Sequence, residues 1–115
     1  MYDLLTDIYF DVNIFFLVPP TITYKNPSGS DITVTENGKQ KLECTADGNP
    51  KPTLEWFRGN VLVETNKNVT LDPIKRQDAG DYRCTATVVA DQQYVESFTI
   101  KVIVRCKYYK ELKKR

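Results

Sequence analysis

One stretch of the sequence, Asp78-Ala79-Gly80-Asp81-Tyr82-Arg83-Cys84, decides how the rest is interpreted. It follows the polar residues Lys75-Arg76-Gln77, and from Tyr82 onward every second residue is apolar or small. The alternation continues through Ala86 and Val88. Strict alternation predicts a β-strand with one face on a core and the other toward solvent. We therefore expect a charged, solvated turn that leads into a half-buried strand.

The same alternation recurs on both sides, in short segments that Gly, Pro and Asn interrupt about every 8–12 residues. Residues 48–52 predict a loop, and Asp91-Gln92-Gln93 predicts the tip of a hairpin. Only residues 4–10 and 108–115 fit short helices. Strands without helices between them indicate an all-β protein with two antiparallel layers. The alternating positions are Ile32 and Val34; Leu42, Cys44 and Ala46; Leu54 and Trp56; and Phe98, Ile100, Val102 and Val104.

Composition restricts the function mainly through what the chain lacks. With 115 residues it is long enough for one compact domain of about 100 residues. It contains no His, which removes the commonest general base and the commonest metal ligand. Its three cysteines, Cys44, Cys84 and Cys106, form no C-x-x-C pair of the kind that binds zinc. We expect no enzyme, no metal site and no cofactor.

The net charge of +1 is unevenly distributed along the chain. Residues 105–115 carry six basic side chains against Glu111, a net of +5, so the other residues carry −4. A mildly acidic body argues against binding to nucleic acid. The basic tail, residues 106–115, is interpreted as a solvated end, and the alternative is contact with an acidic glycan or an anionic lipid.

Cys44, Trp56 and Cys84, taken together with the run Asp78–Cys84, resemble the signature of the immunoglobulin superfamily. The stretch from Cys44 to Pro52, followed by Trp56-Phe57-Arg58, is similar to the I-set and C2-set branches of that superfamily. The resemblance covers about residues 19–104. It implies an immunoglobulin-like Greek-key β-sandwich of about seven strands in two antiparallel sheets, over residues 19–105.

The resemblance also implies roles for individual residues. Cys44 and Cys84 would form a disulfide across the core, with Trp56 packed against it. The phenol of Tyr82 would hydrogen-bond back to the chain at the preceding corner, where Gly80 supplies backbone freedom. The alternative for the two cysteines is a pair of buried thiols in an intracellular domain. Leu71 and Asp78 complete the core signature.

The N-terminal residues do not resemble a secretory signal, because Asp3, Asp7 and Asp11 interrupt the apolar residues. Phe10, Val12, Ile14 and Phe16 alternate as residues 98–104 do, and they run directly into Val18-Pro19-Pro20. We interpret residues 1–18 as the last strand of a preceding domain in a tandem array. The alternative is an additional strand or an extension of this domain.

The functional prediction is an extracellular recognition module that binds other proteins or mediates adhesion, alone or with neighbouring immunoglobulin-like domains. Asn68-Val69-Thr70 is an N-glycosylation sequon, which favours an extracellular setting together with the cysteine pair. The odd thiol Cys106 is either one half of an intermolecular bridge or an accident of truncation. The alternative function is an intracellular structural module of a giant muscle-type protein. The candidate contact loops contain Asp47, Asn49, Lys51, Asp91, Gln92 and Gln93.

Overall fold

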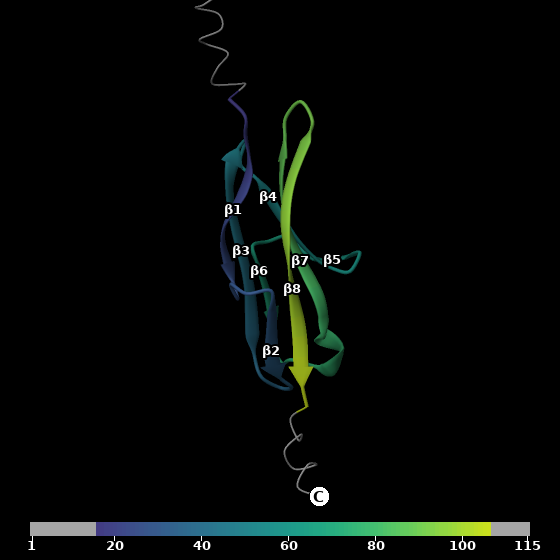
Figure 1. Ribbon diagram of the computed structural model, residues 1–115. Coiled ribbons are helices and arrows are strands. Elements are labelled where there is room, and N and C mark those ends of the chain that lie inside the picture. The colour runs from purple at the N-terminus through teal and green to yellow at the C-terminus, as the bar shows by residue number, and fades with distance from the viewer. Residues whose placement is uncertain (1–15, 107–115) are drawn as a thin grey trace, which may run out of the picture.

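The computed structural model describes residues 16–106, which form two layers of β-strands (Figure 1). The predictions for residues 1–15 and 107–115, including both short helices, lie outside the described residues. The elements are β1 (Val18–Asn26), β2 (Asp31–Thr35), β3 (Gln40–Asn49), β4 (Thr53–Arg58), β5 (Val61–Glu64), β6 (Asn68–Leu71), the 3₁₀ helix η1 (Arg76–Asp78), β7 (Gly80–Val89) and β8 (Gln93–Arg105).

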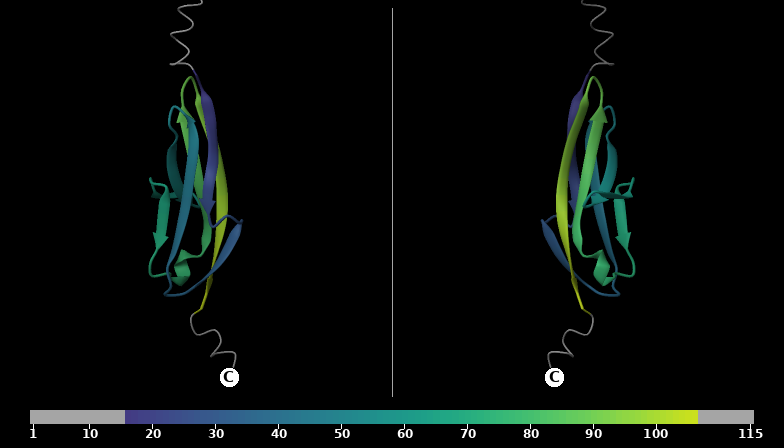
Figure 2. Two further views of the ribbon diagram at one scale, coloured as in Figure 1. Left: turned by 90° about the vertical axis from the view of Figure 1, so that its left-hand side faces the viewer. Right: turned by 90° about the vertical axis from the view of Figure 1, so that its right-hand side faces the viewer.

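The two sheets have the strand orders β1-β3-β6 and β2-β8-β7-β4-β5, and Figure 2 shows them as two layers. All the neighbouring strands are antiparallel except β2 and β8, which pair in parallel from Asp31↔Lys101 to Thr35↔Arg105. The predicted all-β fold of two sheets is confirmed, and the structure adds two details: the described residues form eight strands, and one neighbouring pair is parallel. The reason is that the first strand is divided. After Asn26 the chain crosses to the other layer without reversing, so β2 runs in the same direction as β8.

The predicted loop at residues 48–52 is wrong over its first two residues, which belong to a strand. Strand β3 continues through Asn49, and its last residues pair with β1 through Thr21↔Asp47 and Val18↔Asn49. Pairing with β1 satisfies the backbone groups there, so ladder hydrogen bonds outweigh the local turn preference of Gly48 and Asn49. Only residues 50–52 connect β3 to β4.

The core lies between the layers and is built from the predicted alternating positions. Leu42 and Cys44 of β3 face Cys84 of β7 and Ile100 of β8, and all four are fully buried. Trp56 of β4 is also fully buried and meets the ring of Phe98 edge-on, with the ring centroids 5.8 Å apart. Burying an aromatic side chain of this size contributes about 1.5–3 kcal/mol or more to stability. The remaining buried apolar residues include Val34, Val69, Leu71, Ile74, Tyr82, Ala86, Val88 and Val102.

Candidate functional site

A disulfide joins the two layers at the centre of the core. Cys44 of β3 and Cys84 of β7 are bonded, with their Cα atoms 6.5 Å apart. Trp56 is the cross-strand neighbour of Cys84, so its indole lies beside the bridge, as the resemblance implied. The indole Nε1 donates a hydrogen bond to the backbone oxygen of Lys67 at 3.2 Å, which satisfies its one buried donor. This region is a stabilising centre without accessible reactive groups.

The corner before β7 is held by Tyr82. Its hydroxyl donates a hydrogen bond to the backbone oxygen of Asp78 at 2.6 Å. Burial raises the pKa of the Tyr82 hydroxyl, and the neighbouring Asp78 adds to this, whereas the positive charge of Arg58 lowers it. Gly80 has φ +147°, a conformation that L side chains rarely adopt. The role implied for Tyr82 is present in the structure.

Arg58 is a corner residue that sequence reasoning did not identify. Its guanidinium donates hydrogen bonds to the backbone oxygens of Ala79, at 2.7 Å, and Gln77. It also lies over the ring of Tyr82, 5.8 Å from the centroid. In the sequence, Arg58 is marked only by its position directly after Trp56-Phe57 at the end of β4. That position does not predict which groups its guanidinium binds.

The hairpin tip, residues 90–92, contains the first group of predicted contact residues. Asp91 and Gln92 lie in the turn, and Gln93 begins β8, all with exposed side chains. The backbone N–H of Ala90 donates to the oxygen of Gln92 at 2.9 Å. The hydroxyl of Tyr94 donates to Asp91 Oδ1, also at 2.9 Å, and this bond raises the pKa of Tyr94. Tyr94 therefore holds the tip in one conformation, a role that alternation alone could not reveal.

The second group of predicted contact residues lies at the same end of the sandwich (Figure 1). Asp47 and Asn49 are exposed residues of β3, and Lys51 is exposed in the connection to β4. Asn49 Nδ2 donates to the backbone oxygen of Phe16 at 2.6 Å, which fixes the direction of the chain entering β1. A side chain on Gly48 would meet Val88 Cγ2 at 3.0 Å, so the two layers approach closely there. Both predicted groups thus share one end, although only part of each group lies in a loop.

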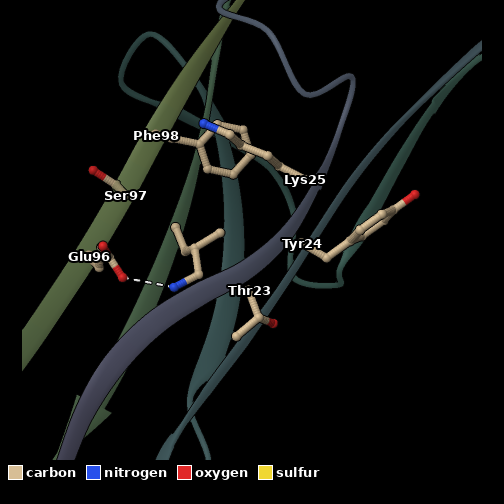
Figure 3. Close-up of a pocket in the computed structure, with 7 residues that line it drawn as sticks. Thr23, Tyr24, Lys25, Glu96, Ser97 and Phe98 are labelled. Carbon is tan, nitrogen blue, oxygen red and sulfur yellow. Dashed lines mark hydrogen bonds between the residues drawn. The ribbon is translucent and has the colours of Figure 1, made fainter.

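A shallow groove between β1 and β8 was not predicted. It has a volume of about 300 Å³ and crosses the gap between the layers. The N–H of Ile22 donates to Glu96 Oε1 at 2.8 Å, and the ammonium of Lys25 lies 5.0 Å from the ring centroid of Phe98 (Figure 3). The β1–β8 groove is lined by Ile22, Thr23, Tyr24, Lys25, Glu96, Ser97 and Phe98.

Two further predicted positions have defined surroundings. Asn68 begins β6 and is half-buried, and its Oδ1 is buried without a hydrogen-bond partner. Cys106 is a half-buried free thiol whose Sγ accepts a hydrogen bond from Arg76 Nη2 at 3.3 Å. Arg76 also pairs with Glu36, at 3.4 Å. Glycosylation of Asn68 and bridging through Cys106 both remain predictions.

Two features are absent from residues 16–106. No group of three or more His, Cys, Asp or Glu side chains in this part of the chain is placed to hold a metal ion. No helix among the described residues is long and apolar enough to cross a membrane. The exposed groups described above are backbone edges, hydroxyls, amides and apolar side chains.

The family follows from comparison with known proteins. Residues 19–87 match the family model described as an immunoglobulin domain, which is more than half of the chain. The chain therefore belongs to the immunoglobulin domain family, and its all-β sandwich, buried tryptophan and Cys44–Cys84 bridge agree with that membership.

Relatives place this domain inside much longer proteins. The chain is 37% identical over 89 residues to hemicentin-2 of Mus musculus, covering 70% of this chain and 2% of that protein. It is also 37% identical over 90 residues to MAM domain-containing glycosylphosphatidylinositol anchor protein 1 of Gallus gallus, covering 68% of this chain and 9% of that protein. The chain thus spans only a small part of these relatives.

Solved structures show the same fold at lower identity. The extracellular domains 3–5 of Drosophila OTK match with a TM-score of 0.67 and 22% identity, over 77% of this chain and 32% of that one. Titin domain M7 matches with a TM-score of 0.63 and 21% identity, over 77% of this chain and 96% of that one. At these identities the likeness establishes the fold and leaves the function open.

Proposed function

We propose that this chain is an extracellular recognition module of a larger adhesion, receptor or matrix protein, and that it binds another protein. The observation that carries the proposal is the disulfide between Cys44 and Cys84, because such bonds form and persist in oxidising compartments. The names of two similar proteins also support an extracellular setting. One name includes a glycosylphosphatidylinositol anchor, and the other refers to extracellular domains.

The hairpin tip is the contact surface that we propose. The last β4–β7 pair is Thr53↔Thr87, whereas the β7–β8 ladder continues to Val89↔Gln93, so the tip extends beyond the neighbouring strand. The bond from Tyr94 to Asp91 orders the turn before any partner arrives. A preorganised loop loses less conformational entropy on binding than a mobile one. Gln92 and Gln93 are exposed and can offer both donors and acceptors.

A screen against purified ectodomains, with the full chain displayed as a multimer, would identify partners for this test. Gln92→Ala with Gln93→Ala should then weaken binding to a partner by about tenfold, the loss of one or two interfacial hydrogen bonds. Gln77→Ala is the matched control, since Gln77 is exposed in η1 at the other end of β7. Equal binding by the tip variant and the control would reject this contact surface.

We also propose that the module belongs to a tandem array, in which the residues before β1 form the last strand of the preceding domain. The range predicted from the sequence, residues 1–18, overlaps this domain by one residue, because Val18 begins β1. The alternating residues Phe10, Val12, Ile14 and Phe16 support this proposal, as does the small share of each relative that the chain spans. Contact of the basic tail, residues 106–115, with acidic glycans or anionic lipid is a separate prediction, and heparin affinity chromatography of a tail-truncated chain tests it.

The second candidate function is an intracellular structural module. Its specific support is the likeness of the fold to titin domain M7, at 21% identity. The two functions differ in the chemical state of Cys44 and Cys84, because cytosolic thiols are kept reduced.

A further inference from the structure

Strand β8 has an uncovered side over more than half of its length. It runs from Gln93 to Arg105, and β7 covers one side as far as Val102. On the other side β2 pairs only with residues 101–105. Within the described residues, the outer side of residues 93–100 therefore has no neighbouring strand in its own sheet. We call these residues the free edge of β8.

Two hydrogen bonds at the C-terminal end of β8 show which backbone groups point outward along the free edge. The N–H of Lys101 donates to the oxygen of Ser30, and the oxygen of Arg105 accepts from the N–H of Glu36, each at 2.9 Å. Both bonds leave β8 on its outer side, and along a strand the N–H and C=O of every second residue point to the same side. Counting back from Lys101 two residues at a time, the N–H and C=O of Thr99, Ser97 and Val95 also point outward, along the free edge.

The free edge lacks most of the features that protect exposed strands from pairing. Proteins shield such edges by making them short or by adding Pro or Lys. Strands β2, β5 and β6 have only four or five residues, and β1 contains Pro19 and Pro20. The free edge has eight residues, Gln-Tyr-Val-Glu-Ser-Phe-Thr-Ile, with no Pro and one charge. Five of them, Tyr, Val, Phe, Thr and Ile, have high β-propensity.

The β1–β8 groove leaves room beside this edge. Strand β1 belongs to the other sheet and reaches β8 here through the side chain of Glu96, as Figure 3 shows. Lys25 lies over Phe98 and forms no ion pair within residues 16–106. The side chain of Val95, on the other face of β8, is 53% exposed.

We propose that the free edge pairs with the free edge of a second copy of this chain, antiparallel and centred on Ser97. Each copy then satisfies the exposed backbone groups of the other, and the contact closes as a two-fold dimer. In this register Ser97 pairs with Ser97 of the second copy, and Val95 pairs with Thr99. Because these residues point their N–H and C=O outward, all three pairs are hydrogen-bonded pairs.

The same register makes the charges complementary. Glu96 lies opposite Phe98 of the second copy, and in each copy Lys25 covers Phe98. The carboxylate of one copy therefore comes beside the ammonium of the other, twice per dimer by symmetry. The paired residues 95–99 do not include Gln92 or Gln93, so the dimer and the proposed partner contact stand or fall independently.

Amide hydrogen exchange of the full chain tests the register directly, with Cys106→Ser present so that covalent dimers do not form. At low concentration the amides of Val95, Ser97 and Thr99 should exchange quickly, whereas those of Glu96, Phe98 and Ile100 are protected by β7. Raising the protein concentration to the millimolar range should slow exchange at the first three only. Fast exchange at all three, in a protein that stays monomeric by sedimentation equilibrium, would overturn the proposal, even if a different protein's strand bound there.

Substitution at Ser97 gives a second test in the same background. Ser97→Pro removes an outward N–H that the monomer does not use, and edge positions of this kind tolerate Pro. It should raise the dimer dissociation constant by at least about tenfold, since a symmetric dimer loses the bond twice. Ser97→Ala keeps the N–H and should change the constant by less than about threefold. Equal constants for the two variants would contradict the pairing.

A charge exchange covers the case in which Ser97→Pro fails to fold. Lys25→Glu should weaken the dimer, because it places two carboxylates together across the contact. Lys25→Glu combined with Glu96→Lys should recover the dissociation constant at least in part. A double variant as weak as Lys25→Glu alone would reject the Glu96–Lys25 contact and with it the register centred on Ser97.

Discussion

Single residues determine how the chain turns into β7. The hydroxyl of Tyr82, the guanidinium of Arg58 and the backbone freedom of Gly80 meet at the corner formed by residues 77–80. The resemblance to the immunoglobulin signature predicted the hydrogen bond of Tyr82 and the need for Gly80. It did not predict Arg58, because the partners of Arg58 are backbone oxygens about twenty positions away, and a long-range contact of that kind leaves no local pattern.

Tyr82→Phe should lower the free energy of unfolding by about 1 kcal/mol at pH 7, the usual net contribution of one hydrogen bond. The ring stays in place, so the loss reports the bond from the hydroxyl to Asp78. Urea unfolding followed by the fluorescence of Trp56 measures it. An unchanged midpoint would show that the hydroxyl contributes nothing to the corner.

The same substitution should change the response to alkaline pH. The pKa of Tyr82 is raised in the folded state, so the folded protein holds this proton more tightly than the unfolded chain does. Its contribution is therefore complete below the unfolded value of about 10 and is lost as pH rises through the folded value. Wild type should lose more stability than Tyr82→Phe as the pH rises above about 10. Equal losses would contradict the raised pKa.

Gly80→Ala should destabilise the fold by about 1–3 kcal/mol, because φ +147° is strained for any residue with a Cβ. The added atom would also lie 3.2 Å from Arg58 Nε. Gly29→Ala is the matched control, since its nearest new contact is the oxygen of Asp31 at 3.8 Å. Thermal unfolding of the two variants provides the comparison, and a similar small effect in both would show that the corner tolerates a side chain.

At the level of strands, alternation predicted which residues face the core but not how far each strand runs. Leu42 and Cys44 were placed correctly, yet β3 extends through Asn49 because β1 pairs with it to the end. The parallel β2–β8 pair was missed for a related reason. Which strands become neighbours depends on the chain crossing between layers after Asn26, and side-chain periodicity carries no information about that crossing.

The hairpin formed by β7 and β8 gives a prediction at this scale. Tyr94→Phe removes the bond to Asp91 and should increase amide exchange at Ala90, Asp91 and Gln92, because the turn loses its side-chain support. The central β7–β8 ladder, which buries Cys84 and Ile100, should keep its protection. Hydrogen exchange by NMR distinguishes the two regions. Unchanged exchange at the tip would mean that Tyr94 does not order it.

For the whole molecule, the sandwich and its central bridge were predictable from the sequence, whereas the β1–β8 groove and the free edge of β8 were not. The spacing of Cys44, Trp56 and Cys84 identifies a core that many proteins share. The groove lies between β1 of one sheet and β8 of the other, and the free edge exists because β2 pairs with only part of β8. No single segment of the sequence therefore determines either feature.

Removing the bridge should test its contribution to the whole fold. Cys44→Ala with Cys84→Ala should cost about 4 kcal/mol, the entropy that a cross-link over 40 positions removes from the unfolded chain. That loss is comparable to the total stability of a small domain, so we expect a largely unfolded protein. Cys106→Ser should leave the unfolding midpoint unchanged. Circular dichroism during thermal unfolding compares the variants.

The most direct test of an extracellular module is the state of its thiols in the cells that make it. The protein should be alkylated as the cells are lysed, digested without reduction and analysed by mass spectrometry. We expect a peptide pair linked through Cys44 and Cys84, and no alkylation at either residue. Quantitative alkylation of both residues would contradict the extracellular assignment and favour the intracellular structural module.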